Sequence, residues 1–170
     1  YMIIAFAGWA DAADAATTAI KYLTRKLKAR KIAELDPEEF YDFSLTRPHT
    51  TRSKDGRRKI HWPVNDFFSW TPENSDKGTL FYLGVEPNLR WRTFSDEITG
   101  LAKQHGVTTV VHLGALLDAV PHTREVRLTG SSTRPALQRY YTDSGVNAST
   151  YQGPTGISSV LLESFANAGI

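Results

Sequence analysis

The sequence predicts an α/β fold in which helices cover both faces of a mostly parallel central sheet. Three apolar runs, at 1–8, 79–85 and 107–114, are typical of strands that are buried on both faces. Helical patterns separate them: 11–30 is alanine-rich with apolar residues at helical spacing, and 91–101 has the same spacing. Strands that alternate with helices form parallel sheets through right-handed connections, which gives three layers.

Local signals place the remaining elements between these runs. Residues 32–35 form a further strand, and Asp36 before Pro37 caps one helical turn. In the C-terminal third, the pattern predicts a loop and short strand at 120–132, a helix at 134–145 and a second helix at 153–169. Thr155 is the expected cap of the second helix. The sequence shows no internal repeat or linker, so we expect one α/β domain over 1–170.

The two ends of the sequence suggest a longer natural chain. Tyr1 already lies inside a strand pattern, and Gly169 is a helix-terminating residue followed only by Ile170. We therefore expect the domain to be truncated at both ends, with Ile170 opening another buried strand.

Residues 47–63 predict a β-hairpin. Asp55 and Gly56 supply the positive φ angles of a tight turn, and strand alternation places Ile60 and Trp62 on one face. This hairpin has little of its own to bury. It is expected to project from the domain or to pack that face against another chain.

Four aromatic residues of this region form a candidate interface: Trp62, Phe67, Phe68 and Trp70. Isolated hairpins are marginally stable in water, and clustered aromatic side chains are typical of protein interfaces. We therefore expect a homo-oligomer.

Composition excludes several classes of protein. The chain has no cysteine and no apolar run near the roughly 20 residues of a membrane span, so a cytoplasmic protein without membrane contact is expected. Its net charge is +2, and its basic clusters are interpreted as solvated faces, without aromatic residues placed for nucleic-acid stacking. The histidine spacing supports no metal site, and no motif indicates a cofactor or a catalytic set.

The first strand-to-helix turn, GWAD at 8–11, matches no phosphate-binding loop. Asp11 at the N-cap and Asp14 at the third helical position are suited to satisfy the free amides at the helix start. These carboxylates would repel a phosphate. Trp9 is interpreted as a cover over the core.

Glu86 allows two interpretations. If a helix begins at Glu86, it forms an exposed i,i+4 pair with Arg90, as Arg92 does with Asp96. Alternatively, Glu86 ends a strand inside a crevice and holds an arginine. A buried carboxylate left alone costs about 3 to 5 kcal/mol, so we expect Glu86 to be largely buried and paired with Arg90, Arg92 or Arg124.

Two loops could complete this crevice by holding an oxyanion. One carries an imidazole, a hydroxyl and a guanidinium on consecutive positions, and the other presents amides at a helix start. The candidate residues are His122, Thr123, Arg124, Gly153, Thr155 and Gly156. Turn chemistry explains the second loop equally well, and an ordinary polar loop explains the first.

Six segments in order resemble the proteasome assembly chaperone 2 family, in its actinobacterial-type branch: FAGWADAADAAT, DPEEFYDF followed by TRP, HWP, GVEPNLRWRTF, LGALLDAVPHTR and YQGPTGI. The resemblance implies a three-layer α/β domain similar in outline to nucleoside phosphorylases. Archaeal and eukaryotic relatives help to assemble proteasome rings, and bacterial members look like homo-oligomers. No catalytic residue transfers; the matching positions are Gly8, Trp9, Asp11, Glu86, Pro87, Trp91, His122, Arg124, Gly153 and Gly156.

Two hypotheses about function follow. The first is a non-enzymatic, oligomeric protein of the assembly-chaperone type, which acts through protein–protein contacts with itself and with proteasome-related proteins. The alternative is a small-molecule binding protein, or a phosphorylase- or hydrolase-like enzyme. In that case Glu86, His122 and Arg124 would bind a ligand that bears phosphate or carboxylate.

Overall fold

A computed structural model of the chain describes the backbone of residues 1–170 and all side chains except those of Gln138, Arg139 and Thr142. The chain divides into two compact units, one formed by 1–116 with 156–170 and the other by 117–155. No change in composition marks these boundaries, and the division was not expected from the sequence. Each unit is described by itself.

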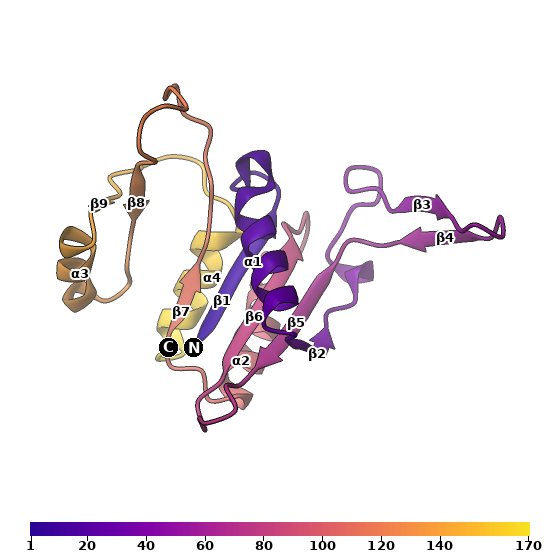
Figure 1. Cartoon of the computed structure of the whole chain (residues 1–170), viewed down its shortest axis with the longest axis horizontal. Coiled ribbons are helices and arrows are strands. Elements are labelled where there is room, and N and C mark those ends of the chain that lie inside the picture. Colours follow the sequence, from indigo (N-terminus) through magenta and orange to yellow (C-terminus); the bar gives the residue numbers. More distant parts are fainter. The chain divides into compact units, whose positions relative to one another are not determined.

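The first unit is built on a five-stranded sheet (Figure 1). Its strand order is β2 (Arg30–Glu34), β5 (Asn65–Trp70), β6 (Thr79–Val85), β1 (Met2–Ala7) and β7 (Val110–His112). β1 is parallel to both neighbours, whereas β5 is antiparallel to β2 and β6. Only β5 thus runs against the other four strands, which confirms the mostly parallel sheet.

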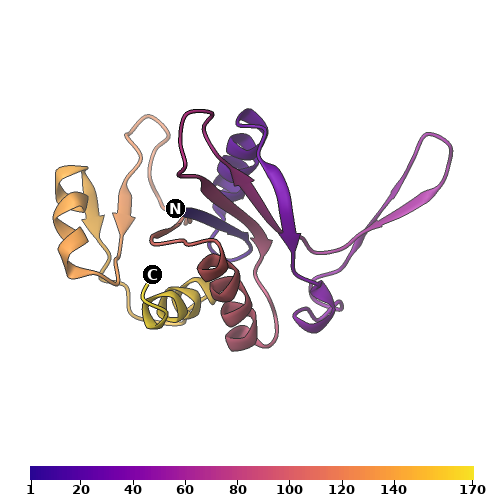
Figure 2. The ribbon, with the colours of Figure 1, turned by 90° about the horizontal axis from the view of Figure 1, so that it is seen from below.

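Helices cover both faces of this sheet, as Figure 2 shows. α1 (Ala15–Lys26) lies on one face, and α2 (Trp91–Gln104) and α4 (Ile157–Asn167) lie on the other. Successive side chains of a strand point to opposite faces, so the central strands supply both cores. The predicted α/β fold with helices on both faces is confirmed.

The larger core lies between the sheet and the pair α2 and α4. It contains Met2, Ile4, Phe6, Phe67, Tyr82, Phe94, Ile98, Leu161 and Phe165. Aromatic rings meet across it, with ring centroids 5.1 Å apart for Phe6 and Tyr82. Each such side chain contributes about 1.5 to 3 kcal/mol on burial. A smaller cluster under α1 contains Ala5, Ala16, Ile20 and Phe81.

The predicted hairpin is present and projects from the first unit (Figure 1). β3 (His49–Arg52) and β4 (Arg58–His61) pair antiparallel, and Gly56 in their connecting turn has a φ of +81°. Glycine adopts this angle without the steric cost of a side chain. The helical turn at Pro37–Glu39 is also confirmed, because the Asp36 side chain accepts a hydrogen bond from the Glu38 amide at 2.9 Å.

The predicted starts of α1 and α4 are wrong, whereas that of α2 is confirmed. α1 begins at Ala15, because Ala13 and Asp14 have left-handed φ angles of 53° and 55°. α2 begins at Trp91, where the predicted helical spacing begins, and Arg90 before it has a φ of 52°, so the alternative in which the helix begins at Glu86 is excluded. The N-cap of α4 is Gly156 rather than Thr155.

The second unit contains a two-stranded parallel sheet of β8 (Leu128–Gly130) and β9 (Val146–Ala148). A 3₁₀ turn (Pro135–Leu137) and α3 (Gln138–Asp143) connect these strands. The predicted strand and helix are therefore present, and β9 was not predicted. Among the described residues of both units, no helix has the length and apolar character needed to cross a bilayer.

Candidate functional site

Glu86 is the centre of a polar cluster at the carboxyl ends of β1, β6 and β7. We call this cluster, formed by Trp9, Glu86, His112, Ile157 and Ser158, the strand-end site. One Glu86 oxygen, Oε1, accepts a hydrogen bond from the Ile157 amide at 2.9 Å, and Oε2 accepts one from the Trp9 amide at 3.3 Å. In open α/β sheets, ligands bind at this edge of the sheet.

Two glycines allow the Glu86 side chain to reach these amides. A Cβ atom on Gly156 would lie 2.7 Å from Glu86 Oε1, and one on Gly8 would lie 3.0 Å from Glu86 Cβ. Gly8 also has a φ of 139°, which side-chain-bearing residues rarely adopt. The matching glycines of the two segments therefore have a steric role, which is to make room for the carboxylate.

The predicted arginine partner of Glu86 is wrong, and Glu86 is half-buried rather than largely buried. Among the described side chains, no arginine lies within ion-pair distance of Glu86. Arg90 instead pairs with Glu39 at 2.5 Å on the surface, and Arg92 is exposed. Backbone amides at a turn and at the start of α4 provide the positive partial charge that we had assigned to an arginine.

The segment that follows Glu86 is held to the 36–43 segment. The amides of Asn88 and Leu89 both donate to the Phe40 carbonyl at 3.0 Å. The Trp91 indole donates to the Pro87 carbonyl at 2.7 Å. These bonds, with the Arg90–Glu39 pair, hold the loop before α2, so Arg90 and Trp91 have a structural role there.

His112 and Ser158 form the second contact of the strand-end site. Nε2 of His112, on the last residue of β7, lies 3.1 Å from Oγ of Ser158, the second residue of α4. Burial lowers the pKa of His112, and the nearby Glu86 charge opposes this effect in part. His112 is therefore mainly neutral at neutral pH. Sequence reasoning missed this pair, because no motif links two residues that are 46 positions apart.

Asp11 satisfies the start of α1, as predicted. Its side chain is 7% exposed and accepts hydrogen bonds from the amides of Ala16 at 2.8 Å and Thr17 at 3.1 Å. It also accepts from the Thr17 hydroxyl at 2.6 Å. The expectation for Asp14 is wrong: it stands before the helix, and its side chain forms no capping bond.

The other predicted crevice residues lie in the second unit. His122, Thr123 and Arg124 occupy an exposed turn, where the Arg124 amide donates to the Pro121 carbonyl at 3.0 Å. Gly153 and Thr155 are exposed as well. Of the two loops, only Gly156 belongs to the unit that contains Glu86. A crevice shared by these residues stays a prediction. Among the described side chains, no group of three His, Asp or Glu could hold a metal ion.

The four candidate interface residues have different surroundings. Trp62 is 48% exposed, and its ring packs against Phe43 with centroids 5.0 Å apart. Phe68 and Trp70 are half-buried against the core under α1. Phe67 is 0% exposed, so its assignment to an interface is wrong. It belongs to a strand whose alternate side chains face the larger core. Trp62 and its neighbour Ile60, which is 55% exposed, remain as surface residues.

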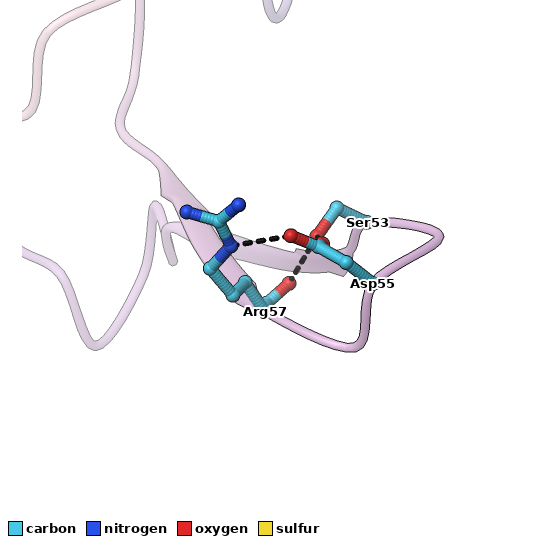
Figure 3. Close-up of polar contacts among 3 residues, drawn as sticks. All are labelled: Ser53, Asp55 and Arg57. Carbon is cyan, nitrogen blue, oxygen red and sulfur yellow. Dashed lines mark hydrogen bonds and ion pairs between the residues drawn. The ribbon is translucent and has the colours of Figure 1, made fainter.

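The hairpin turn is held by local polar contacts (Figure 3). The Asp55 carboxylate accepts hydrogen bonds from Ser53 and from the Arg57 guanidinium, and the Ser53 hydroxyl lies 3.0 Å from the Arg57 carbonyl oxygen. The Ser53 hydroxyl bond, followed by the Arg57 bond, lowers the pKa of Asp55. The turn is otherwise basic, since it carries Arg52, Lys54, Arg57, Arg58 and Lys59.

A cavity of about 450 Å³ lies at the base of the hairpin. Its wall includes Trp62, Val64, Glu34 and Asp66, and Lys31 forms an ion pair with Asp66 at 2.8 Å. The bonds of Lys31 to Asp66 and then to Glu34 raise the pKa of Lys31. The further acids of the wall are Asp36 and Glu38. The base of the hairpin is therefore acidic, whereas its turn is basic.

These features define a class of protein: a three-layer α/β protein with an exposed hairpin and a glutamate bound to backbone amides. The PAC2 family model matches residues 5–170, and the chain belongs to the PAC2 family. This finding confirms the resemblance of the six sequence segments. Comparison with the curated proteins finds no match.

Solved structures of PAC2 proteins are similar to this chain. A PAC2 family protein from Streptomyces avermitilis is 40% identical, with a TM-score of 0.86, over 99% of this chain and 70% of that one. A proteasome-assembly chaperone homologue from Mycobacterium tuberculosis is 38% identical, with a TM-score of 0.88 and the same coverage. An archaeal homologue of a proteasome-assembly chaperone, from Pyrococcus furiosus, is 19% identical over 99% of this chain and 63% of that one. Its TM-score of 0.65 shows a shared fold alone.

Proposed function

We propose that this chain acts through protein–protein contacts, in a role like that of the proteasome-assembly chaperones, and that its hairpin binds a second copy of the chain. The names of similar proteins support the chaperone-like role. The observation that supports self-association is the exposure of the hairpin, because every residue of β3 and β4 is exposed.

The apolar residues of the hairpin favour contact with another protein. Ile60, Trp62 and Val64 are 55%, 48% and 44% exposed and lie close together in the sequence, from β4 to the start of β5. A two-stranded hairpin is marginally stable in water by itself. Covering these side chains with a second chain buries apolar surface and stabilises the hairpin.

The charges of the hairpin favour a second copy as the partner. Its turn carries an excess of basic residues, and its base carries the acidic residues Glu34, Asp36, Glu38 and Asp66. In a two-fold dimer the same surface of each subunit meets its equivalent. Two hairpins that pack antiparallel place the basic turn of one against the acidic base of the other, so that opposite charges meet across the interface.

Light scattering after gel filtration tests the self-association. Wild type at micromolar concentration should have the mass of a dimer or larger oligomer. The double change Ile60→Ser and Trp62→Ala should lower the mass toward that of a monomer. Tyr22→Ala is the matched control, because Tyr22 is an aromatic residue that is 52% exposed on α1, away from the hairpin. A monomeric wild type, or an oligomer that the double change leaves intact, would overturn the hairpin contact.

The chaperone-like role has a separate test. Purified chain is mixed with proteasome subunits from the source organism, and ring formation is followed by native electrophoresis. The proposal expects faster ring formation with the chain present. Equal rates with and without the chain would refute this role and leave the self-association result unaffected.

A further inference from the structure

The geometry points to Ser158 and His112 as a nucleophile and general base pair, which gives the chain a serine-dependent acyl-transfer activity on small esters. This inference is independent of the protein-binding role. Its central observation is the distance of 3.1 Å between Ser158 Oγ and His112 Nε2. A serine hydroxyl within hydrogen-bond reach of an imidazole is the arrangement that activates serine for nucleophilic attack.

The position of Ser158 suits a nucleophile. It is the second residue of α4, at the carboxyl edge of the parallel strands, where α/β proteins carry their reactive groups. The amide groups in the first turn of a helix have no acceptor within the helix. In α4 the Ile157 amide is bonded to Glu86 and the Ser159 amide donates to the Gly156 carbonyl at 3.2 Å, so the Ser158 amide is the first-turn group that can stabilise the negative charge that develops on a carbonyl oxygen during acyl transfer. Ser158 is half-buried, so its hydroxyl keeps access to a small substrate.

The surroundings of His112 suit a base. Nε2 must lack a proton in order to accept the proton of Ser158, and burial, by lowering the pKa of His112, favours this neutral form. Among the described residues, Glu86 is the charged group whose field reaches the imidazole. Its negative charge stabilises the imidazolium that forms when the proton moves. Glu86 is itself held by the amides of Trp9 and Ile157, so its position is fixed.

The reaction balances with water as the second substrate. Ser158 Oγ forms a bond to the ester carbonyl carbon as its proton moves to His112 Nε2. The bond from that carbon to the leaving oxygen then breaks, and the alkoxide takes the proton from His112 and departs as an alcohol. Water attacks the acyl group on Ser158, with its proton passing through His112 back to Oγ, and the carboxylic acid is released.

A purely structural role is the competing explanation, because the same hydrogen bond ties α4 to β7. The two roles differ in reactivity. A structural serine has the low nucleophilicity of an ordinary hydroxyl, whereas an activated serine reacts with fluorophosphonates by displacing fluoride.

The experiment treats the whole folded chain with a fluorophosphonate probe and maps the adduct by peptide mass spectrometry. We expect one adduct, on Ser158. Mapping on wild type requires no variant to fold. Absence of an adduct on Ser158 would overturn the inference.

Variants and a second substrate complete the test. Ser159→Ala, the neighbouring exposed serine, should react as wild type does, and Ser158→Ala should not react. His112→Gln should react at least about 100-fold more slowly, as removal of a general base predicts. Hydrolysis of p-nitrophenyl acetate should follow the same order. A wild-type rate in folded His112→Gln, checked by circular dichroism, would show that His112 is no base.

Discussion

The strand-end site and the β3–β4 hairpin are held in different ways. At the strand-end site, hydrogen bonds join residues 77, 71 and 46 positions apart, from the first strand turn, the ends of two further strands and the start of α4. In the hairpin, paired residues are at most 12 positions apart, from His49 to His61. Loss of one side chain at the strand-end site therefore affects several elements, whereas a change in the hairpin is expected to stay local.

Asp11→Ala should have the largest effect on stability. The buried carboxylate receives two amide bonds and one hydroxyl bond at the start of α1, and alanine leaves these donors without an acceptor. We expect the free energy of unfolding to fall by about 2 to 3 kcal/mol. Urea denaturation measures the change. Asp14→Asn is the control, since Asp14 is exposed and its side chain caps nothing, and its shift should stay within about 0.5 kcal/mol. Equal effects of the two changes would contradict the capping role.

Glu86→Gln should have an intermediate effect. Each oxygen of Glu86 accepts one backbone amide, and the glutamine side chain has only one oxygen. One amide then faces an NH₂ group, and we expect a loss of about 1 to 2 kcal/mol in urea. Glu39→Gln breaks the exposed pair with Arg90 and should cost less than about 0.5 kcal/mol. If Glu86→Gln unfolds at the wild-type urea concentration, the carboxylate does not hold α4.

His112 should make stability dependent on pH. Its pKa in the folded chain is lower than in the unfolded chain, where it is about 6.5, so the unfolded chain binds the proton more readily. The contribution of the neutral imidazole to the free energy of unfolding is fully present above about pH 6.5. It falls as the pH drops from there toward the lowered pKa. Urea midpoints of wild type and His112→Gln at several pH values should show a difference that changes over this range. A constant difference would contradict the burial effect on His112.

Gly56→Ala in the hairpin turn should have the smallest effect on global stability. Alanine disfavours the φ of +81° at this position, but an added Cβ atom meets nothing within 4 Å. Under conditions where the chain is monomeric, we expect the free energy of unfolding measured in urea to change by less than about 0.5 kcal/mol. Trypsin should nevertheless cut faster after Arg57, Arg58 and Lys59, because the turn opens more often. Unchanged cleavage would show that the turn does not limit hairpin opening.

Some of these features could be predicted from the sequence because they depend on near neighbours. The apolar runs predicted the central strands, Asp55 and Gly56 predicted the hairpin turn, and Asp11 before an alanine-rich segment predicted a helix cap. Each of these signals acts over a few residues. The start of α1 was missed, because left-handed φ angles at Ala13 and Asp14 delay the helix.

The partner of Glu86 could not be predicted in the same way. Charge arguments favoured an arginine, and three arginines stood at reasonable positions in the sequence. The structure instead uses amides of Trp9 and Ile157, which are chemically the same as every other backbone amide. Nothing in the residue types at those two positions indicates that their amides are free, because that depends on the turn and on where α4 begins.

The sequence by itself determined the α/β class, the exposed hairpin and the family, since hydrophobic periodicity, turn residues and ordered motifs are local properties of the chain. Only the tertiary structure decided that Phe67 belongs to the core, that Glu86 bridges two backbone amides and that His112 lies beside Ser158. The physical reason is the sheet. Parallel strands bring their carboxyl ends to one edge whatever their separation in the sequence, and strand alternation decides which side chains face each core.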